Sequence, residues 1–536
     1  MDSWKIHQFN GERADIVAEV IRRTLLDTGR NPEAAELAIN DVAFQELARL
    51  EGTPKHTQRM RAWTDLYRRL GKRSPAEQAQ ILRQLTTDYA RDIVGSFNPN
   101  VYRFATSIIP RGLSLLFRKR ALSNAPRMEE LERRIQVRGK IEELRQLAKI
   151  GTVILVPTHS SNLDSIVLGF ALDRLGLPPV TYGAGKNLFS NRLVGYFMHN
   201  LGAYRVDRRL KNELYKNVLK NYSSVILERG FHSLFFPGGT RSRSGAVEQK
   251  LKLGLLGTGL SAYINNILQN RPNPNIFIVP VTINYPLVLE AASQIDDHLK
   301  AVGKSRYIIE DDEFSRVGRI WSYARAILNF DGHMVINIAP ALDPLGNPVD
   351  QAGRSLDPHG RPIELHRYLL TEGVFGADAR RDAEYTRECG EAICRSFQRH
   401  NVILSTHLAA FTLFELLRVR HPQLELYRLL RLTANETLPI DLVETVTLAL
   451  RIELLGLVAE GKIEVSDGIR QDSIEHVLER AFGYFQMYHS RPLVEQVGEE
   501  VRLVDLKLLY YYHNRLAGYG LEKFVKAASV EKNTRV

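Results

Sequence analysis

His159 and Asp164 are the two residues of this sequence whose types and spacing best suit acid–base chemistry. They stand five positions apart, directly after an apolar run at residues 153–157. Five residues of regular helix rotate by roughly 140°, so the two side chains could not meet within one helix. With His159 in a loop and Asp164 in the first turn of the next helix, the carboxylate can accept from one imidazole nitrogen and leave the other as a base.

A base of this kind suits the removal of a proton from an alcohol that attacks an activated acyl carbon. We prefer this direct transfer to a covalent intermediate on Ser160 or Ser161, because no Gly-x-Ser-x-Gly elbow surrounds either serine. The alternative is purely structural: Asn162 or Asp164 caps the helix, and His159 has no chemical role.

Two arginine-rich segments follow along the chain. Residues 235–245 end an apolar run in a glycine-rich turn, where Gly238 and Gly239 permit close backbone approach and Arg241 offers donors suited to a phosphate. Residues 202–209 carry a second dense patch of guanidinium groups. Taken singly, the first is explained as well by a tight turn with solvated arginines, and the second by a solvated surface.

The elements that must position these residues begin near residue 151, where short apolar runs alternate with helical stretches. This alternation predicts an α/β layered domain with a mixed, largely parallel sheet flanked by helices, and it places the chemistry in loops at strand ends. Helical periodicity dominates before and after it. We therefore expect an N-terminal helical unit at 1–100, the α/β domain at 101–362 and a C-terminal helical domain at 363–536.

The composition limits the partners of the chain. Its 536 residues carry a formal net charge of +11, which predicts attraction to polyanions. Because no helix-turn-helix, zinc-finger spacing or RNP-like strand is found, we expect no nucleic acid, and anionic lipid and phosphorylated substrates remain. The two cysteines, Cys389 and Cys394, provide neither a disulfide framework nor a paired zinc motif, so we expect isolated thiols in a reducing compartment.

A membrane phospholipid surface is one expected partner. No run approaches the roughly 18 consecutive apolar residues of a spanning helix, which predicts peripheral or interfacial attachment. Residues 101–119 mix apolar and aromatic side chains with basic ones and are interpreted as a candidate interfacial segment; the alternative is an amphipathic helix pair packed on the core around Pro110. The N-terminus lacks the pattern of a signal peptide, so we expect the cytoplasmic face of the inner membrane.

Taken together, in this order and with these gaps, the segments resemble the glycerol-3-phosphate acyltransferase family. The family's first block, a His and an Asp separated by four residues, matches His159 and Asp164. Its second block looks like residues 202–208, and its fourth, a proline inside an apolar strand, resembles Pro280. Its third block resembles Phe236, Gly239, Arg241 and Ser242. The downstream run 284–290 is closer to the glycerol 3-phosphate branch than to the lysophosphatidate branch.

The resemblance implies a glycerol-3-phosphate 1-O-acyltransferase of phospholipid synthesis, which uses acyl-CoA or acyl carrier protein (acyl-ACP) as donor and needs no metal or other cofactor. His159 would be the general base on glycerol 3-phosphate, with Asp164 orienting it. Arg208, with Arg209 as the alternative, would help to hold the phosphate. The substrate-binding residues that the resemblance implies are Tyr204, Arg208, Gly239, Arg241, Ser242, Arg243, Lys252 and Pro280.

One departure from the family pattern leaves alternatives open. Gly238 stands where the third block normally carries a glutamate, which is expected to orient the acceptor hydroxyls or the arginines. Its loss would weaken catalysis, change the acceptor, or be made good by another acid such as Glu248. The alternatives to glycerol 3-phosphate are dihydroxyacetone phosphate and lysophosphatidate, and the alternative to an enzyme is a non-catalytic scaffold that binds lipid or an acyl carrier.

Overall fold

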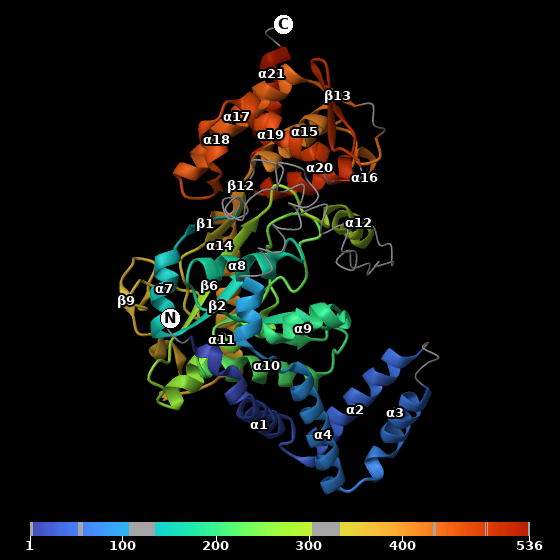
Figure 1. The fold of residues 1–536 in the computed structure, drawn as a ribbon, viewed down its shortest axis with the longest axis vertical. Coiled ribbons are helices and arrows are strands. Elements are labelled where there is room, and N and C mark those ends of the chain that lie inside the picture. Colours follow the sequence, from blue (N-terminus) through green and yellow to red (C-terminus); the bar gives the residue numbers. More distant parts are fainter. Residues whose placement is uncertain are drawn as a thin grey trace.

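The computed structural model describes residues 4–51, 57–106, 135–302, 333–432, 436–487, 489 and 491–533. The N-terminal helices lie at one end of the long axis, a sheet with its flanking helices lies in the middle, and the C-terminal helices lie at the other end (Figure 1). The middle group positions the candidate site.

The central sheet is built from β1 (Ile135–Gly139), β2 (Thr152–Pro157), β3 (Thr181–Gly185), β4 (Ala203–Val206), β5 (Ser233–Leu234), β6 (Ile276–Asn284) and β7 (Met334–Ile338). These seven strands have the order β1-β7-β6-β2-β5-β3-β4. All neighbours are parallel except β6 and β7, which are antiparallel. The mixed, largely parallel sheet expected from the sequence is thus confirmed.

Helices cover both faces of this sheet. They are α7 (Ile141–Ile150), α8 (Asp164–Arg174), η4 (Lys186–Ser190), α9 (Arg192–Asn200), α10 (Glu213–Glu228), α11 (Leu253–Leu268) and α14 (Ala379–Arg399), whereas α12 (Ala291–Val302) packs against a C-terminal helix. Side chains of β2 alternate between the faces: Val153 and Leu155 join the core beneath α7 and α8, whereas Ile154 and Val156 join the core beneath α11 and α14. Helix α14 thus covers the sheet, although it follows the expected boundary at residue 362.

The N-terminal helices are η1 (Lys5–Gln8), α1 (Phe9–Thr28), α2 (Pro32–Leu50), α3 (Thr57–Arg69), η3 (Leu70–Lys72) and α4 (Pro75–Ile93). Helix α4 begins with a capping box between Ser74 and Glu77, a pattern that satisfies backbone N–H groups at the start of a helix. Helices α1 and α4 pack on α10, and Arg23 forms a 2.6 Å ion pair with the buried Glu228 across this contact.

Short elements link the sheet to the C-terminal helices: β8 (Ser355–Leu356), β9 (Pro362–Ile363), η6 (Leu365–Leu369), β10 (Leu370–Thr371), β11 (Val374–Phe375) and β12 (Val402–Ile403). The C-terminal elements are α15 (Ser405–Arg420), α16 (Leu426–Leu429), β13 (Thr437–Pro439), α17 (Ile440–Ala459), β14 (Glu464–Val465), α18 (Asp467–Gln471), α19 (Ile474–Met487), β15 (Val494–Val497), β16 (Glu500–Leu503), α20 (Leu506–His513), η7 (Asn514–Leu516) and α21 (Glu522–Asn533).

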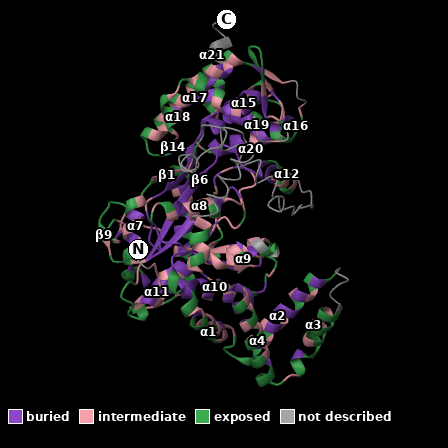
Figure 2. Cartoon of the chain, viewed as in Figure 1, coloured by how far each residue is buried: buried purple, intermediate pink, exposed green. Residues whose placement is uncertain are grey.

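Helix α15 forms the centre of this C-terminal region and is buried on all sides from Ser405 to Leu417 (Figure 2). It packs against α17, α19, α20 and α21. The helical region expected from the sequence is confirmed, but it also contains a small antiparallel sheet, β13-β16-β15, which the sequence did not predict.

The candidate interfacial segment at 101–119 falls mostly outside the described residues. Its first part, residues 101–106, is helical, and the ring of Phe104 stacks on Phe197 of α9 with 5.9 Å between centroids. In the described parts of the chain, none of the helices has the length and apolar character required to cross a bilayer.

Candidate active site

His159 and Asp164 meet in the way that their spacing suggested. Strand β2 ends at Pro157, α8 begins at Asp164, and His159 lies in the loop between them. Its Nδ1 is 2.8 Å from Oδ2 of Asp164. The aspartate is fully buried, whereas the histidine side chain keeps 13% of its surface exposed. The pair therefore combines a sheltered carboxylate with an imidazole that a substrate can reach.

The partners of Asp164 determine which nitrogen of His159 carries its proton. Oδ2 also accepts the backbone N–H groups of Ser160 and Ser161, at 2.7 and 2.9 Å, and Oδ1 accepts the hydroxyl of Tyr285 at 2.5 Å. A carboxylate surrounded by donors is an acceptor, so the network assigns the proton to Nδ1. Nε2 of His159 then has a free lone pair and is the candidate base.

The glycine-rich turn holds His159 on three sides. The backbone N–H of Ser242 donates to the carbonyl of His159 at 2.7 Å, and Oε1 of Glu248 accepts the backbone N–H of His159 at 2.7 Å. The ring of Phe236 stacks on the imidazole, with 4.0 Å between centroids and 21° between planes. Segments about 80 residues apart are thereby fixed to one another around the candidate base.

A second buried carboxylate, Glu290, links the histidine loop to Arg241. It accepts the hydroxyl of Ser161 and the N–H of Asn162, both at 2.9 Å, and lies 3.4 Å from Nη1 of Arg241. Burial raises the pKa of the Glu290 carboxyl, and the charge of Arg241 opposes that rise. Glu290 ends the run 284–290, which resembles the family, but the sequence analysis predicted no role for it.

The positive charges of Arg241 and Arg243 act on the guanidinium of Arg208. Loss of solvent around its side chain, and then repulsion from Arg241 and Arg243, lower the pKa of Arg208, although part of this side chain remains exposed. Within the described ranges no acid pairs with Arg208, whereas Arg209 lies 3.1 Å from Asp207. This arrangement favours Arg208 over Arg209 as an anion ligand.

The other residues that the resemblance implies for substrate binding lie in different parts of the structure. Gly239 has φ +76°, and a Cβ there would lie 2.8 Å from Cγ of Lys252, so Lys252, the N-cap of α11, lies against the turn that contains Gly239. Tyr204 is fully buried and packs against Tyr222, in the core between the sheet and the N-terminal helices. Pro280 lies in the middle of β6, opposite Val156 of β2. The structure places neither Tyr204 nor Pro280 in the hydrogen-bond network around His159.

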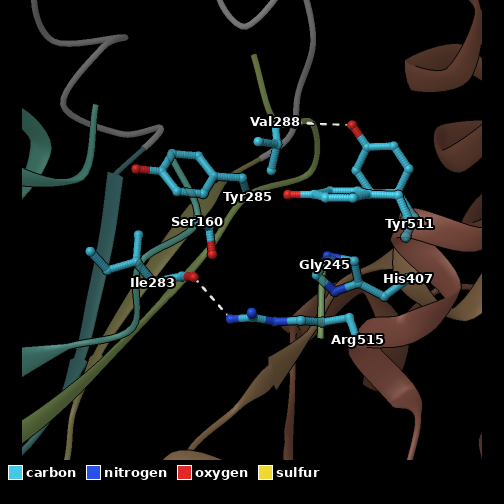
Figure 3. Close-up of a pocket in the computed structure, with 9 residues that line it drawn as sticks. Ser160, Gly245, Ile283, Tyr285, Val288, His407, Tyr511 and Arg515 are labelled. Carbon is cyan, nitrogen blue, oxygen red and sulfur yellow. Dashed lines mark hydrogen bonds between the residues drawn. The ribbon is translucent and has the colours of Figure 1, made fainter. Parts of the chain in front are cut away.

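The C-terminal helices reach the site, which the sequence did not indicate. Tyr511 donates to Oε1 of Gln294 at 3.1 Å, and Nε2 of Gln294 donates to the carbonyl of Ser160 at 2.9 Å. The buried Arg515 donates to Oδ1 of Asn284 at 2.6 Å. A cavity of about 20 Å³, room for about one water molecule, lies where these helices meet the histidine loop (Figure 3).

Comparison with known proteins agrees with this geometry. Residues 134–284 match the family model described as Acyltransferase. The glycerol-3-phosphate acyltransferase of Pseudomonas syringae pv. syringae (strain B728a) is 34% identical over 224 residues, 41% of this chain and 25% of the relative. That of Pseudomonas fluorescens (strain SBW25) is 28% identical over 283 residues, 52% of this chain and 30% of the relative.

A third relative, the glycerol-3-phosphate acyltransferase of Xanthomonas axonopodis pv. citri (strain 306), is 29% identical over 198 residues, 37% of this chain and 21% of the relative. The matched region thus spans between about a fifth and a third of the length of these curated relatives. The His–Asp pair, the arginine segments and the strand β6 lie within residues 134–284, which match the family model. Residues 134–284 of this chain form an acyltransferase domain.

Proposed function

We propose that this protein transfers a fatty acyl group from acyl-CoA or acyl-ACP to a hydroxyl of glycerol 3-phosphate and so forms lysophosphatidate. One observation carries the proposal: the loop that holds the oriented His159–Asp164 pair is joined through Glu290 to Arg241, and the charges of Arg241 and Arg243 act on Arg208. The names of the matched relatives support this acceptor.

The reaction needs a base but no enzymic nucleophile. Nε2 of His159 takes the proton of the acceptor hydroxyl while the hydroxyl oxygen attacks the thioester carbon. The carbon–sulfur bond then breaks, and the departing thiolate recovers the proton from the imidazolium. Asp164 holds the ring through Nδ1 and stabilises the imidazolium that forms in between.

The arginines account for the choice of a phosphorylated acceptor. Guanidinium groups bind phosphate oxygens through paired hydrogen bonds, and a phosphate dianion relieves their mutual repulsion. A fixed phosphate also holds the hydroxyl of the same small molecule near Nε2 of His159, which replaces a random encounter by a positioned one. Ser242 and Arg243 belong to the same turn and are proposed to contribute to this binding, as are Gly239 and Lys252.

We further propose that the protein works at the cytoplasmic face of the inner membrane, where its product belongs. The exposed side chains of Phe104 and Tyr196, with Phe197 between them in contact with both, support a surface that touches lipid. We also propose a division into units at residues 1–100, 101–362 and 363–536, with α14 of the third unit packed against the sheet of the second.

Acceptor comparison tests the proposal. Purified protein would be given palmitoyl-CoA, phospholipid vesicles and glycerol 3-phosphate, dihydroxyacetone phosphate or lysophosphatidate in turn, and the lipid product would be identified. We expect kcat/KM to be highest with glycerol 3-phosphate. Faster turnover of another acceptor would reassign the substrate, and transfer to none of them would favour the non-catalytic scaffold that Gly238 suggests.

A further inference from the structure

The carboxylate of Glu248 differs from those of Asp164 and Glu290, because one of its two oxygens is buried without a hydrogen-bond partner among the described residues. Oε1 accepts the backbone N–H of His159 at 2.7 Å. Oε2 is buried and has no hydrogen-bond partner among the described residues. Burial raises the pKa of Glu248, whereas the hydrogen bond from His159 and the positive charge of Arg515 lower it. The residue is half-buried, but a buried carboxylate oxygen without a partner is costly to keep, so the position of Oε2 calls for a reason.

Glu248 also occupies the space that a side chain at position 238 would enter. A Cβ built on Gly238 would lie 3.2 Å from Cγ and 3.6 Å from Oε1 of Glu248. The backbone of Gly238 is not left-handed, so its conformation does not require glycine. The small residue at 238 is therefore explained by the Glu248 side chain lying beside it.

Besides Phe236, which stacks on the ring, three hydrogen-bonded residues position His159. Asp164 fixes the ring through Nδ1, and the N–H of Ser242 fixes the backbone carbonyl of His159 at 2.7 Å. Glu248 is the acceptor for the remaining backbone group, the N–H of His159. Loss of this acceptor would free the main chain next to the base while leaving the hydrogen bond to Asp164 possible.

We propose that Glu248 is a positioning residue for His159, and that it supplies from position 248 the carboxylate that the turn lacks at position 238. This inference rests on the proposed function, in which His159 is the base. It makes a specific claim about the chain: a glutamate at position 238 can replace Glu248 in this role, provided that residue 248 is changed to alanine.

The test uses four variants of the full chain. Glu248→Ala is expected to lower kcat by about 10- to 100-fold with less than about a threefold change in the acceptor KM, because a misplaced base affects the chemical step. Glu248→Gln keeps an amide oxygen for the N–H of His159 and should stay within about fivefold of wild type. Gly238→Glu should lower kcat, since two carboxylates would compete for one space.

The fourth variant combines Gly238→Glu with Glu248→Ala. Its kcat should be at least about tenfold higher than that of Glu248→Ala alone. Gln249→Ala, an exposed neighbour in the same turn, is the matched control and should behave as wild type. Failure of the double variant to recover, or an unchanged kcat in Glu248→Ala, would overturn the proposal.

Amide hydrogen exchange separates this inference from the proposed function. Exchange of the His159 N–H should be faster in Glu248→Ala than in wild type and slower again in the double variant, at equal melting temperature. This readout does not require acyl transfer. Wild-type protein that transfers nothing would refute the proposed function, yet the exchange rates would still decide on Glu248: unchanged exchange in Glu248→Ala refutes its role, and the expected pattern supports it.

Discussion

Replacing Asp164 by asparagine removes the charge beside His159 while keeping the shape of the side chain. The amide oxygen can take the place of Oδ2 and accept the N–H groups of Ser160, Ser161 and His159 Nδ1. The amide nitrogen then faces the hydroxyl of Tyr285, which can turn to accept. We therefore expect Asp164→Asn to fold normally and to keep the proton on Nδ1.

The cost should appear when the imidazolium forms. A hydrogen bond to a charged group contributes about 1.5–3 kcal/mol, against about 0.5–1.5 kcal/mol for a neutral one, so the difference is about 1–2 kcal/mol. At about 1.4 kcal/mol per factor of ten, kcat should fall about 5- to 30-fold, with little change in the acceptor KM.

Initial rates of acyl transfer to glycerol 3-phosphate would measure the effect of Asp164→Asn. Asp173→Asn, on the same helix but away from the histidine loop, is the matched control and should keep the wild-type rate. An unchanged kcat in Asp164→Asn would refute the reasoning, because it would mean that no charge develops on His159 during the reaction.

Two further predictions concern phosphate binding and acid stability. Arg241→Ala should raise the acceptor KM about tenfold or more and the donor KM much less, because its guanidinium is proposed to bind phosphate; equal rises in both constants, or the same effect from the exposed control Arg271→Ala, would count against that role. His232 is buried, accepts the N–H of Val153 at 3.0 Å, and has its pKa lowered by burial to about 4. Above about pH 6.5 this histidine is neutral in both the folded and the unfolded state, so the fold keeps its full stability. As the pH falls from about 6.5 toward 4, the unfolded state takes up a proton first, and the free energy of unfolding declines by about 2–3 kcal/mol at pH 4.5. His232→Asn keeps an acceptor for Val153, so its free energy of unfolding in urea should decline less between pH 7 and pH 4.5; an equal decline in both proteins would contradict the assignment.

Local sequence patterns predicted the part of the structure that depends on neighbouring residues. The apolar runs that became β2 and β6 are buried over their whole length, as expected for interior strands of a parallel sheet. The spacing of His159 and Asp164 predicted a loop and a helix start, and both are present. In these cases the backbone geometry of a few residues fixes the result.

Contacts between distant segments could not be read in the same way. Arg515 bonds Asn284, which lies 231 residues earlier, and no sequence period links such positions. The strands β13, β15 and β16 have only three or four residues each, too few for an alternating pattern to stand out. Glu248 was named as a candidate acid, but its contact with the main chain of His159 depends on how the turn folds back.

The most direct test of the central claim is acyl transfer from palmitoyl-CoA to radiolabelled glycerol 3-phosphate by purified protein with lipid vesicles, compared with His159→Ala. The exposed His476→Ala, on α19, is the control for loss of a histidine elsewhere. We predict labelled lysophosphatidate from the wild type and the control, and a loss of at least about 1,000-fold in His159→Ala. Comparable rates in wild type and His159→Ala would contradict the assignment of His159 as the base.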